Sequence, residues 1–113
     1  MINLPHQKPI RFVNHIVEKN DNYAIVSALF PTVPTLAMVC EAAAQSSAAF
    51  ADEAKIGYLI SLKDCQTLKS LDKTIYQIKV IRVSNMDAIY EFEFNLLDND
   101  SICVSGSFMI KLL

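Results

Sequence analysis

At 113 residues and 12.6 kDa, the chain has the length of a single domain. Because 52% of its residues are hydrophobic and 19% are charged, the composition excludes a disordered or low-complexity protein and is sufficient for one hydrophobic core. The formal net charge of −2 argues against a protein that binds nucleic acid by neutralising phosphates.

The beginning of the chain has the pattern of a β-hairpin. Residues 10–18 and residues 23–30 both combine β-branched and aromatic side chains, which favour strands. The run Lys19-Asn20-Asp21-Asn22 between them is typical of a turn. Pro31 and Pro34 then end the second predicted strand, because proline cannot donate to a strand ladder.

A helix is predicted from Thr35 to about Glu53. Thr35 is a suitable N-cap, and the segment after it is rich in Ala, Met, Leu, Glu and Gln, which favour helix. Because its many alanines make the helix thin, we expect a central helix that other backbone approaches closely. Residues 36–51 are too few for a membrane span, which needs roughly 20 residues. The residues at helical spacing that we expect to face the core are Leu36, Val39, Cys40, Ala43, Ser47 and Phe50.

The rest of the chain has the pattern of strands, at residues 58–68, 74–83, 89–97 and 102–112, with turns at 84–87 and 98–100. In residues 89–97, apolar Tyr90, Phe92, Phe94 and Leu96 alternate with polar residues, so one face of this strand should be buried. Antiparallel strands with a single apolar helix must cover that helix with their apolar face. The sequence therefore predicts an α+β fold, a curved antiparallel sheet of five to six strands around one helix.

The cysteines and histidines give no sign of a disulfide framework or a metal site. Cys40, Cys65 and Cys103 are odd in number and share no Cys-x-x-Cys spacing, so we expect reduced thiols in a cytoplasmic protein. Cys40 has no base beside it in sequence, and we interpret it as a small buried hydrophobe rather than a nucleophile. The two histidines, His6 and His15, are too few for a catalytic zinc site, and no signal peptide is evident.

The order of the elements and several motifs resemble the (3R)-hydroxyacyl-acyl-carrier-protein dehydratase family, which has the hotdog fold. The resemblance covers nearly the whole chain, and the helix motif at its distance after Phe-Pro is the most specific part. The matching motifs are Leu4-Pro5-His6, Phe12-Val13-Asn14-His15-Ile16-Val17-Glu18, Phe30-Pro31, Glu41-Ala42-Ala43-Ala44-Gln45 and Leu97-Asp98-Asn99-Asp100-Ser101-Ile102-Cys103.

The resemblance implies that Glu41 is the catalytic acid. In the family, this glutamate and a histidine before Phe-Pro act together at a dimer interface and remove water from a 3-hydroxyacyl thioester. Here Leu29 occupies the histidine position. His6 and His15 match positions that do not carry catalysis in the family. Leu36 stands where the family has a glycine whose backbone N–H polarises the thioester carbonyl, and the preceding loop is shorter.

The resemblance also implies substrate contacts from Phe30, Pro31, Leu36 and Gln45. Gln45 lies one turn after Glu41 and can hydrogen-bond it. The alternative for Glu41 is an ordinary solvated helix face, and the alternative for Gln45 is a satisfied polar residue at an interface. No cofactor is implied, because the acyl group would be carried on the phosphopantetheine of an acyl carrier protein or on coenzyme A. Basic side chains could meet an acidic carrier protein or simply be solvated, namely Lys63, Lys69, Lys73, Lys79 and Arg82.

The expected function is that of a dehydratase-like hotdog protein that handles acyl thioesters in fatty-acid or polyketide-type biosynthesis, such as polyene lipid pathways. Either Glu41 works with a base from elsewhere, or the chain is the non-catalytic half of a hotdog heterodimer. An acyl thioesterase is an alternative, because hotdog thioesterases use an acid on the same helix to activate water or attack the carbonyl. A plain acyl-binding module is another. A homodimer or heterodimer is expected in every case.

Overall fold

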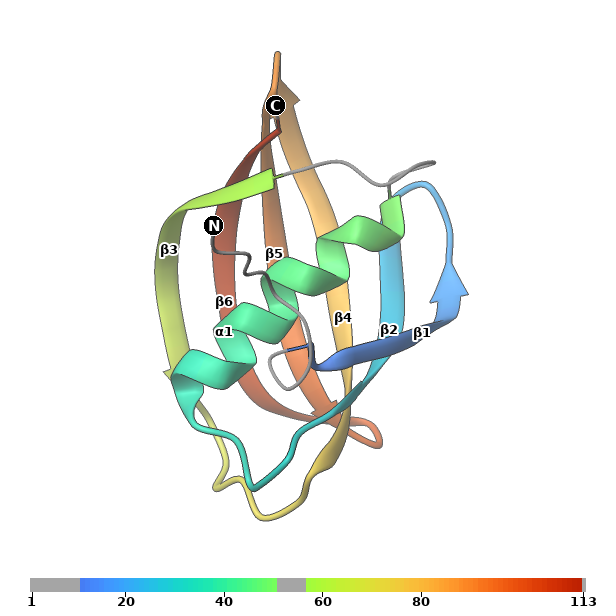
Figure 1. Cartoon of the computed structure of the whole chain (residues 1–113), viewed down its shortest axis with the longest axis vertical. Coiled ribbons are helices and arrows are strands. Elements are labelled where there is room, and N and C mark those ends of the chain that lie inside the picture. The colour runs from blue at the N-terminus through green and yellow to red at the C-terminus, as the bar shows by residue number, and fades with distance from the viewer. Residues whose placement is uncertain (1–10, 51–56, 113) are drawn as a thin grey trace, which may run out of the picture.

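The structure, a computed structural model, describes residues 11–50 and 57–112, which form one antiparallel sheet and one α-helix (Figure 1). The strand order in the six-stranded sheet is β1-β2-β4-β5-β6-β3. The predicted α+β fold, a sheet around one helix, is confirmed, and it is the hotdog arrangement. The elements are β1 (Val13–Lys19), β2 (Tyr23–Leu29), α1 (Leu36–Ser46), a 3-10 turn (Ser47–Phe50), β3 (Gly57–Thr67), β4 (Ile75–Met86), β5 (Ile89–Asp98) and β6 (Ser101–Leu112).

Helix α1 crosses the sheet and is enclosed by its curvature (Figure 1). Thr35 is its N-cap, as predicted, and the Thr35 Oγ1 atom accepts a hydrogen bond of 3.2 Å from the backbone N–H of Met38. The small residues allow close approach to the strands: Ala42 and Ala43 are 0% exposed. No helix in the described ranges is long and apolar enough to cross a membrane.

The helix ends earlier than the sequence predicts. Ser46 Oγ donates to the carbonyl of Ala42, and Ser47 Oγ donates to the carbonyl of Ala44, both at 2.7 Å. Such serine hydroxyls compete for helical carbonyls, and here the backbone tightens into the 3-10 turn that ends at Phe50. The predicted remainder, residues 51–53, lies outside the described residues.

The strand boundaries depart from prediction mainly in β4. The predicted turn at residues 84–87 is wrong, because β4 continues to Met86 and turns only at Asp87, which has a φ of 56°. The register between β4 and β5 shifts between Arg82 and Ser84, so polar residues there lie in a bulged hairpin rather than in the turn. The predicted buried face of β5 is confirmed, with Phe94 1% and Leu96 0% exposed.

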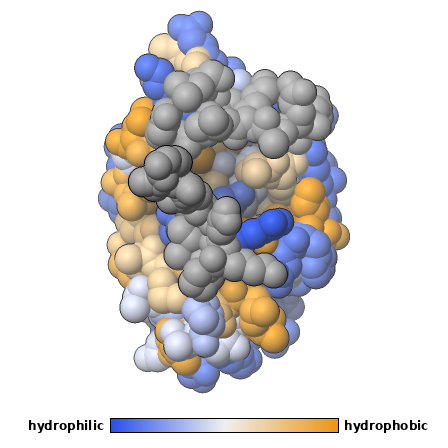
Figure 2. All heavy atoms as spheres, in the orientation of Figure 1, coloured by the Kyte–Doolittle hydropathy of each residue, from blue (hydrophilic) through white to orange (hydrophobic). Residues whose placement is uncertain are grey.

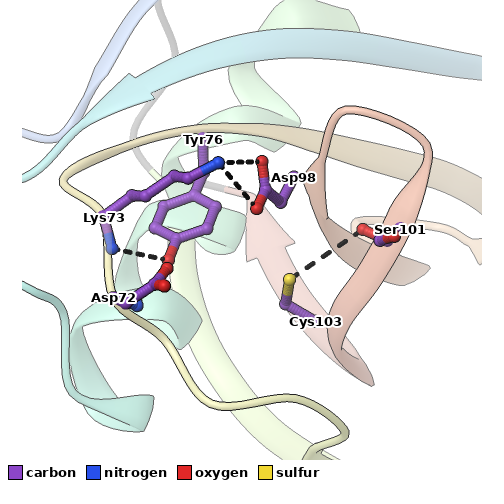
Figure 3. A network of polar contacts seen from close by, with 6 residues as sticks. All are labelled: Asp72, Lys73, Tyr76, Asp98, Ser101 and Cys103. Atoms are coloured by element: carbon purple, nitrogen blue, oxygen red, sulfur yellow. Dashed lines mark hydrogen bonds and ion pairs between the residues drawn. The ribbon is translucent and has the colours of Figure 1, made fainter.

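A buried tyrosine ties the loop before β4 to the sheet (Figure 3). Tyr76 is 3% exposed, and its Oη accepts hydrogen bonds of 3.1 Å from the backbone N–H groups of Asp72 and Lys73. Lys73 Nζ in turn contacts both carboxylate oxygens of Asp98, at 2.8 and 2.9 Å. The loop is thereby fixed to the ends of β4 and β5.

Candidate functional site

Glu41 and Gln45 lie one turn apart on the same face of α1, and both are half-buried. Gln45 Nε2 donates a hydrogen bond of 3.2 Å to Glu41 Oε2. The contact predicted from their spacing is therefore confirmed. Because Glu41 is the acceptor, the amide presents a donor to the carboxylate.

The carbonyl end of the Gln45 side chain is held by the backbone that leads into β1. Gln45 Oε1 accepts hydrogen bonds from the N–H of Phe12 at 2.8 Å and from the N–H of Val13 at 3.3 Å. An amide whose oxygen accepts from backbone donors must direct its NH₂ group the other way, which here is toward Glu41. The beginning of the first strand thus sets the orientation of the group that holds the carboxylate.

Phe12 extends this arrangement to Leu29, the position that matches the histidine of the dehydratases. The backbone N–H of Leu29 donates a 2.8 Å hydrogen bond to the carbonyl of Phe12. Leu29, Phe12, Gln45 and Glu41 therefore form one hydrogen-bonded chain, which we call the Glu41 network. Of its four side chains, only that of Glu41 can take up and release a proton. The side chain of Leu29 is 48% exposed at the end of β2.

Sequence reasoning missed Phe12 as part of this network. Phe12 is 6% exposed, and its ring centroid lies 5.0 Å from that of Phe30. Phe12 begins a matched motif, but nothing in its local pattern points to the distant Gln45. The contact depends on the tertiary position of α1 against β1.

The other predicted site residues have varied environments. Phe30 is 2% exposed and also packs edge-on against Tyr76, at 6.4 Å between ring centroids. Pro31 is exposed, and Leu36 is half-buried and packs against the core. Substrate binding by these residues stays a prediction. His15 is exposed on β1 with Nδ1 3.0 Å from Ser27 Oγ. The Leu4-Pro5-His6 motif lies outside the described residues.

Several basic side chains of the predicted carrier-binding surface are engaged within the chain. Lys73 pairs with Asp98, as described above. Lys79 Nζ lies 4.5 Å from the centroid of the Tyr23 ring. The Arg82 guanidinium lies 4.6 Å from the Phe50 ring centroid, and Phe50 packs against the core as predicted. Lys63 and Lys69 are exposed. Docking of a carrier protein on these residues stays a prediction.

Cys40 is a buried residue of the core and is 6% exposed. Burial, and to a smaller extent the charge and hydrogen bonding of Cys65, together raise the pKa of its thiol to about 12. Such a thiol is protonated at neutral pH, which agrees with its interpretation as a small hydrophobe. Within the part of the chain that the structure describes, no group of three or more His, Cys, Asp or Glu side chains is arranged to hold a metal ion.

No protein-family model matches the sequence, and the curated proteins include no significant match. Solved structures resemble the chain over most of its length. The dehydratase heterocomplex ApeI:P from Xenorhabdus doucetiae has a TM-score of 0.78 and 14% identity, with 97% of this chain and 88% of that chain covered.

Two further structures give similar values. Cj0977, a sigma28-regulated virulence protein from Campylobacter jejuni, has a TM-score of 0.70 and 13% identity, with 88% and 82% coverage. The thioesterase HI1161 from Haemophilus influenzae has a TM-score of 0.66 and 6% identity, with 87% and 76% coverage. At these identities the likeness concerns the fold: the chain adopts the hotdog fold that these structures share.

Proposed function

We propose that the chain is a dehydratase-like hotdog subunit that handles acyl thioesters in fatty-acid or polyketide-type biosynthesis. Its substrate would be a 3-hydroxyacyl group carried on the phosphopantetheine of an acyl carrier protein or on coenzyme A. The observation that carries the proposal is the Glu41 network, in which Gln45 holds the Glu41 carboxylate and Phe12 holds Gln45. The likeness of the chain to a dehydratase heterocomplex supports it.

Dehydration requires one group that removes the proton from the α carbon and one that delivers a proton to the departing hydroxide. Glu41 can perform one of these roles. Leu29 can perform neither, because its side chain is aliphatic. We therefore propose that a second hotdog chain, with a histidine at the position of Leu29, supplies the missing group. The chain would then work as one half of a heterodimer.

The edge strand β3 is the surface best suited to this second chain. In the described part of the sheet, β3 and β1 are the two outer strands. Leu59, Ile60 and Leu62 on β3 are 40%, 48% and 45% exposed, and hydrophobic atoms gather along this margin of the molecule (Figure 2). A partner strand would cover these apolar side chains.

Strand β1 is less suitable as an interface. It has seven residues, whereas β3 has eleven. Its exposed Ile16 and Val17 stand directly between His15 and Glu18. Short edges with charged side chains are the usual protection against pairing with another chain.

The test is an assay of water elimination from a 3-hydroxyacyl carrier protein. We expect no turnover by the chain alone, and turnover when it is mixed with a hotdog chain that has a histidine before Phe-Pro. In the mixture, Glu41→Gln should reduce turnover about 10²- to 10⁴-fold, the contribution of a positioned acid or base. The matched control is Glu93→Gln, because Glu93 is an exposed carboxylate on β5. Equal turnover with Glu41→Gln would remove Glu41 from the mechanism and leave a structural role. Failure to form any complex would overturn the proposal of a heterodimer.

Thioester hydrolysis is the second candidate, and the Glu41 network gives it a specific basis. A lone carboxylate can activate water without a histidine, and Glu41 is the one titratable side chain of the network. Release of free thiol from acyl-coenzyme A by the chain alone, abolished by Glu41→Gln, would establish a thioesterase. That result would overturn the dehydratase proposal.

A further inference from the structure

Strand β1 adds little to the hydrophobic core along most of its length. Every residue from Asn14 to Lys19 is exposed, whereas Val13 at the beginning of the strand is half-buried. In the described sheet, β1 is also an outer strand and pairs on one side with β2 (Figure 1). Their ladder is irregular, because the register shifts between Val13 and Ile16 and again between Ile16 and Glu18. Each shift leaves an extra residue of β1 unpaired, so this segment is weakly attached.

The side-chain hydrogen bonds between β1 and β2 are exposed. His15 Nδ1 lies 3.0 Å from Ser27 Oγ, and the Tyr23 hydroxyl donates a hydrogen bond to the carboxylate of Glu18. Because water competes for these groups, each contact contributes little to holding the strand in place. The apolar side chain of Ile16 is still 49% exposed in the folded chain.

The residue before this segment, in contrast, is anchored in the core. Phe12 is 6% exposed, and its ring centroid lies 5.0 Å from that of Phe30. Its backbone N–H donates to Gln45 Oε1 and its carbonyl accepts from the N–H of Leu29, both at 2.8 Å. None of these contacts involves residues 14–19. Separation of that segment from β2 therefore leaves them intact.

The turn after the segment is closed by its own hydrogen bonds. Asn20 Oδ1 accepts from the backbone N–H of Asn22 at 2.8 Å and from that of Tyr23 at 2.9 Å. The carbonyl of Asn22 accepts a 2.8 Å hydrogen bond from the backbone N–H of Arg82 on β4. The turn is thus attached to β2 and β4, and residues 14–19 lie between two fixed points.

We propose that residues 14–19 form a strap that separates from β2 by local opening, while Phe12 at one end and the turn at Asn20 at the other stay in place. Such an opening requires less free energy than unfolding of the whole domain. Gln45 stays bound to the backbone of Phe12 whether the strap is closed or open. The orientation of the Glu41 carboxylate is therefore insulated from the opening of the edge strand beside it. This inference does not depend on the proposed enzymatic function.

The experiment is residue-resolved hydrogen exchange of the wild-type chain by NMR, at zero and at several sub-denaturing urea concentrations. We expect the amides of the strap to exchange at least about 100-fold faster than those of β4, with rates independent of urea, because local opening exposes little surface. The amide of Phe12 should exchange at least about tenfold more slowly than the strap, with a rate that rises with urea. Strap amides with the urea dependence of β4, or a Phe12 amide that matches the strap, would overturn the proposal.

Two variants test whether the strap and its anchor open separately. Ile16→Ala should accelerate exchange in the strap about three- to tenfold and leave the Phe12 amide unchanged. Phe12→Leu weakens the ring packing and should accelerate exchange at the Phe12 amide. The matched control is Ile102→Ala, an exposed isoleucine on β6, which should leave strap exchange at the wild-type rate.

Equal acceleration of the strap and of Phe12 in Ile16→Ala would show that they open as one unit, which would also overturn the proposal. The same conclusion would follow if Phe12→Leu left the Phe12 amide unchanged. Because the urea profile of the wild type decides the outcome by itself, a folding defect in one variant would not obscure it.

Discussion

The backbone N–H of Phe12 donates a 2.8 Å hydrogen bond to Oε1 of Gln45, across 33 positions of sequence. This bond attaches the residue before β1 to the last turn of α1. It also directs the amide of Gln45 toward the Glu41 carboxylate. The attachment of Phe12 to α1 and the hydrogen bond to the Glu41 carboxylate therefore both depend on the Gln45 side chain.

Gln45→Ala should destabilise the chain by about 1 kcal/mol, because it leaves part-buried backbone donors at Phe12 and Val13 without their acceptor. Urea denaturation measures the free energy of unfolding, and hydrogen exchange should speed up at these two amides. Gln45→Glu keeps an acceptor for them but cannot donate to Glu41, so it should preserve their protection. If hydrogen exchange at the Phe12 and Val13 amides were unchanged in Gln45→Ala, their hydrogen bonds to Gln45 would be contradicted.

Leu29→His tests whether the missing imidazole explains a lack of dehydratase activity. Leu29 is 48% exposed at the end of β2, so the larger side chain can be accommodated there. The wild type alone should show no turnover of a 3-hydroxyacyl carrier protein, and we expect Leu29→His alone to show measurable turnover. Leu29→Gln, which is polar but not a base, should remain at the wild-type level. Equal rates for the two variants would count against the proposed role of this position.

Gly106→Ala should destabilise the chain by about 1–3 kcal/mol through overpacking. The new Cβ would lie 2.7 Å from Cys65 Sγ, a distance that forces the side chain or strand to move. Addition of Cys65→Ala removes that sulfur, so the double variant should be less destabilised than the sum of the single variants. Strict additivity in urea denaturation would show that Cys65 does not occupy this space.

Tyr76→Phe should cost about 1–2 kcal/mol, because two backbone N–H groups lose the oxygen that accepts from them. Lys73→Met removes the exposed ion pair with Asp98 and should have a smaller effect, since surface ion pairs contribute little. Thermal and urea denaturation of the two variants provide the comparison. A larger effect from Lys73→Met would reverse the assigned importance of the two contacts.

Cys40 should make stability depend on alkaline pH. Its pKa is raised in the folded chain to about 12 from 9.0, so the folded state keeps a proton that the unfolded state releases between these values. The contribution is therefore complete below pH 9 and is lost as the pH rises toward about 12. Between about pH 8 and about pH 10.5, the wild type should lose more stability than Cys40→Ala. Equal losses of unfolding free energy in the wild type and Cys40→Ala, measured by urea denaturation, would contradict this effect of Cys40.

The parts of the fold that follow from local patterns could be predicted from the sequence. The alternation in β5 identified Phe94 and Leu96 as buried, and Thr35 was recognisable as an N-cap. The hydrogen bond between Gln45 and Glu41 followed from their spacing of one helical turn. Each of these features involves residues that are close in sequence.

Other features depend on competition or on tertiary position, and the sequence alone does not reveal them. The composition favoured helix beyond Ser46, but serine hydroxyls there bond to carbonyls of the preceding turn. Turn-forming residues near Ser84 lie in a bulged strand, because pairing with β5 outweighs their local preference. The contact of Phe12 with Gln45 arises only when the sheet wraps around α1.

The alanines of α1 have a consequence for where a fatty tail can lie. Ala42, Ala43 and Val39 are all 0% exposed against the strands, and protein interiors are packed as densely as organic crystals. These residues leave no space for an acyl chain between the helix and its own sheet. If the protein handles acyl groups, the acyl chain of the substrate must lie along the outer side of α1. The acyl-chain length that fits would then be set by the partner subunit that forms the opposite wall of the site.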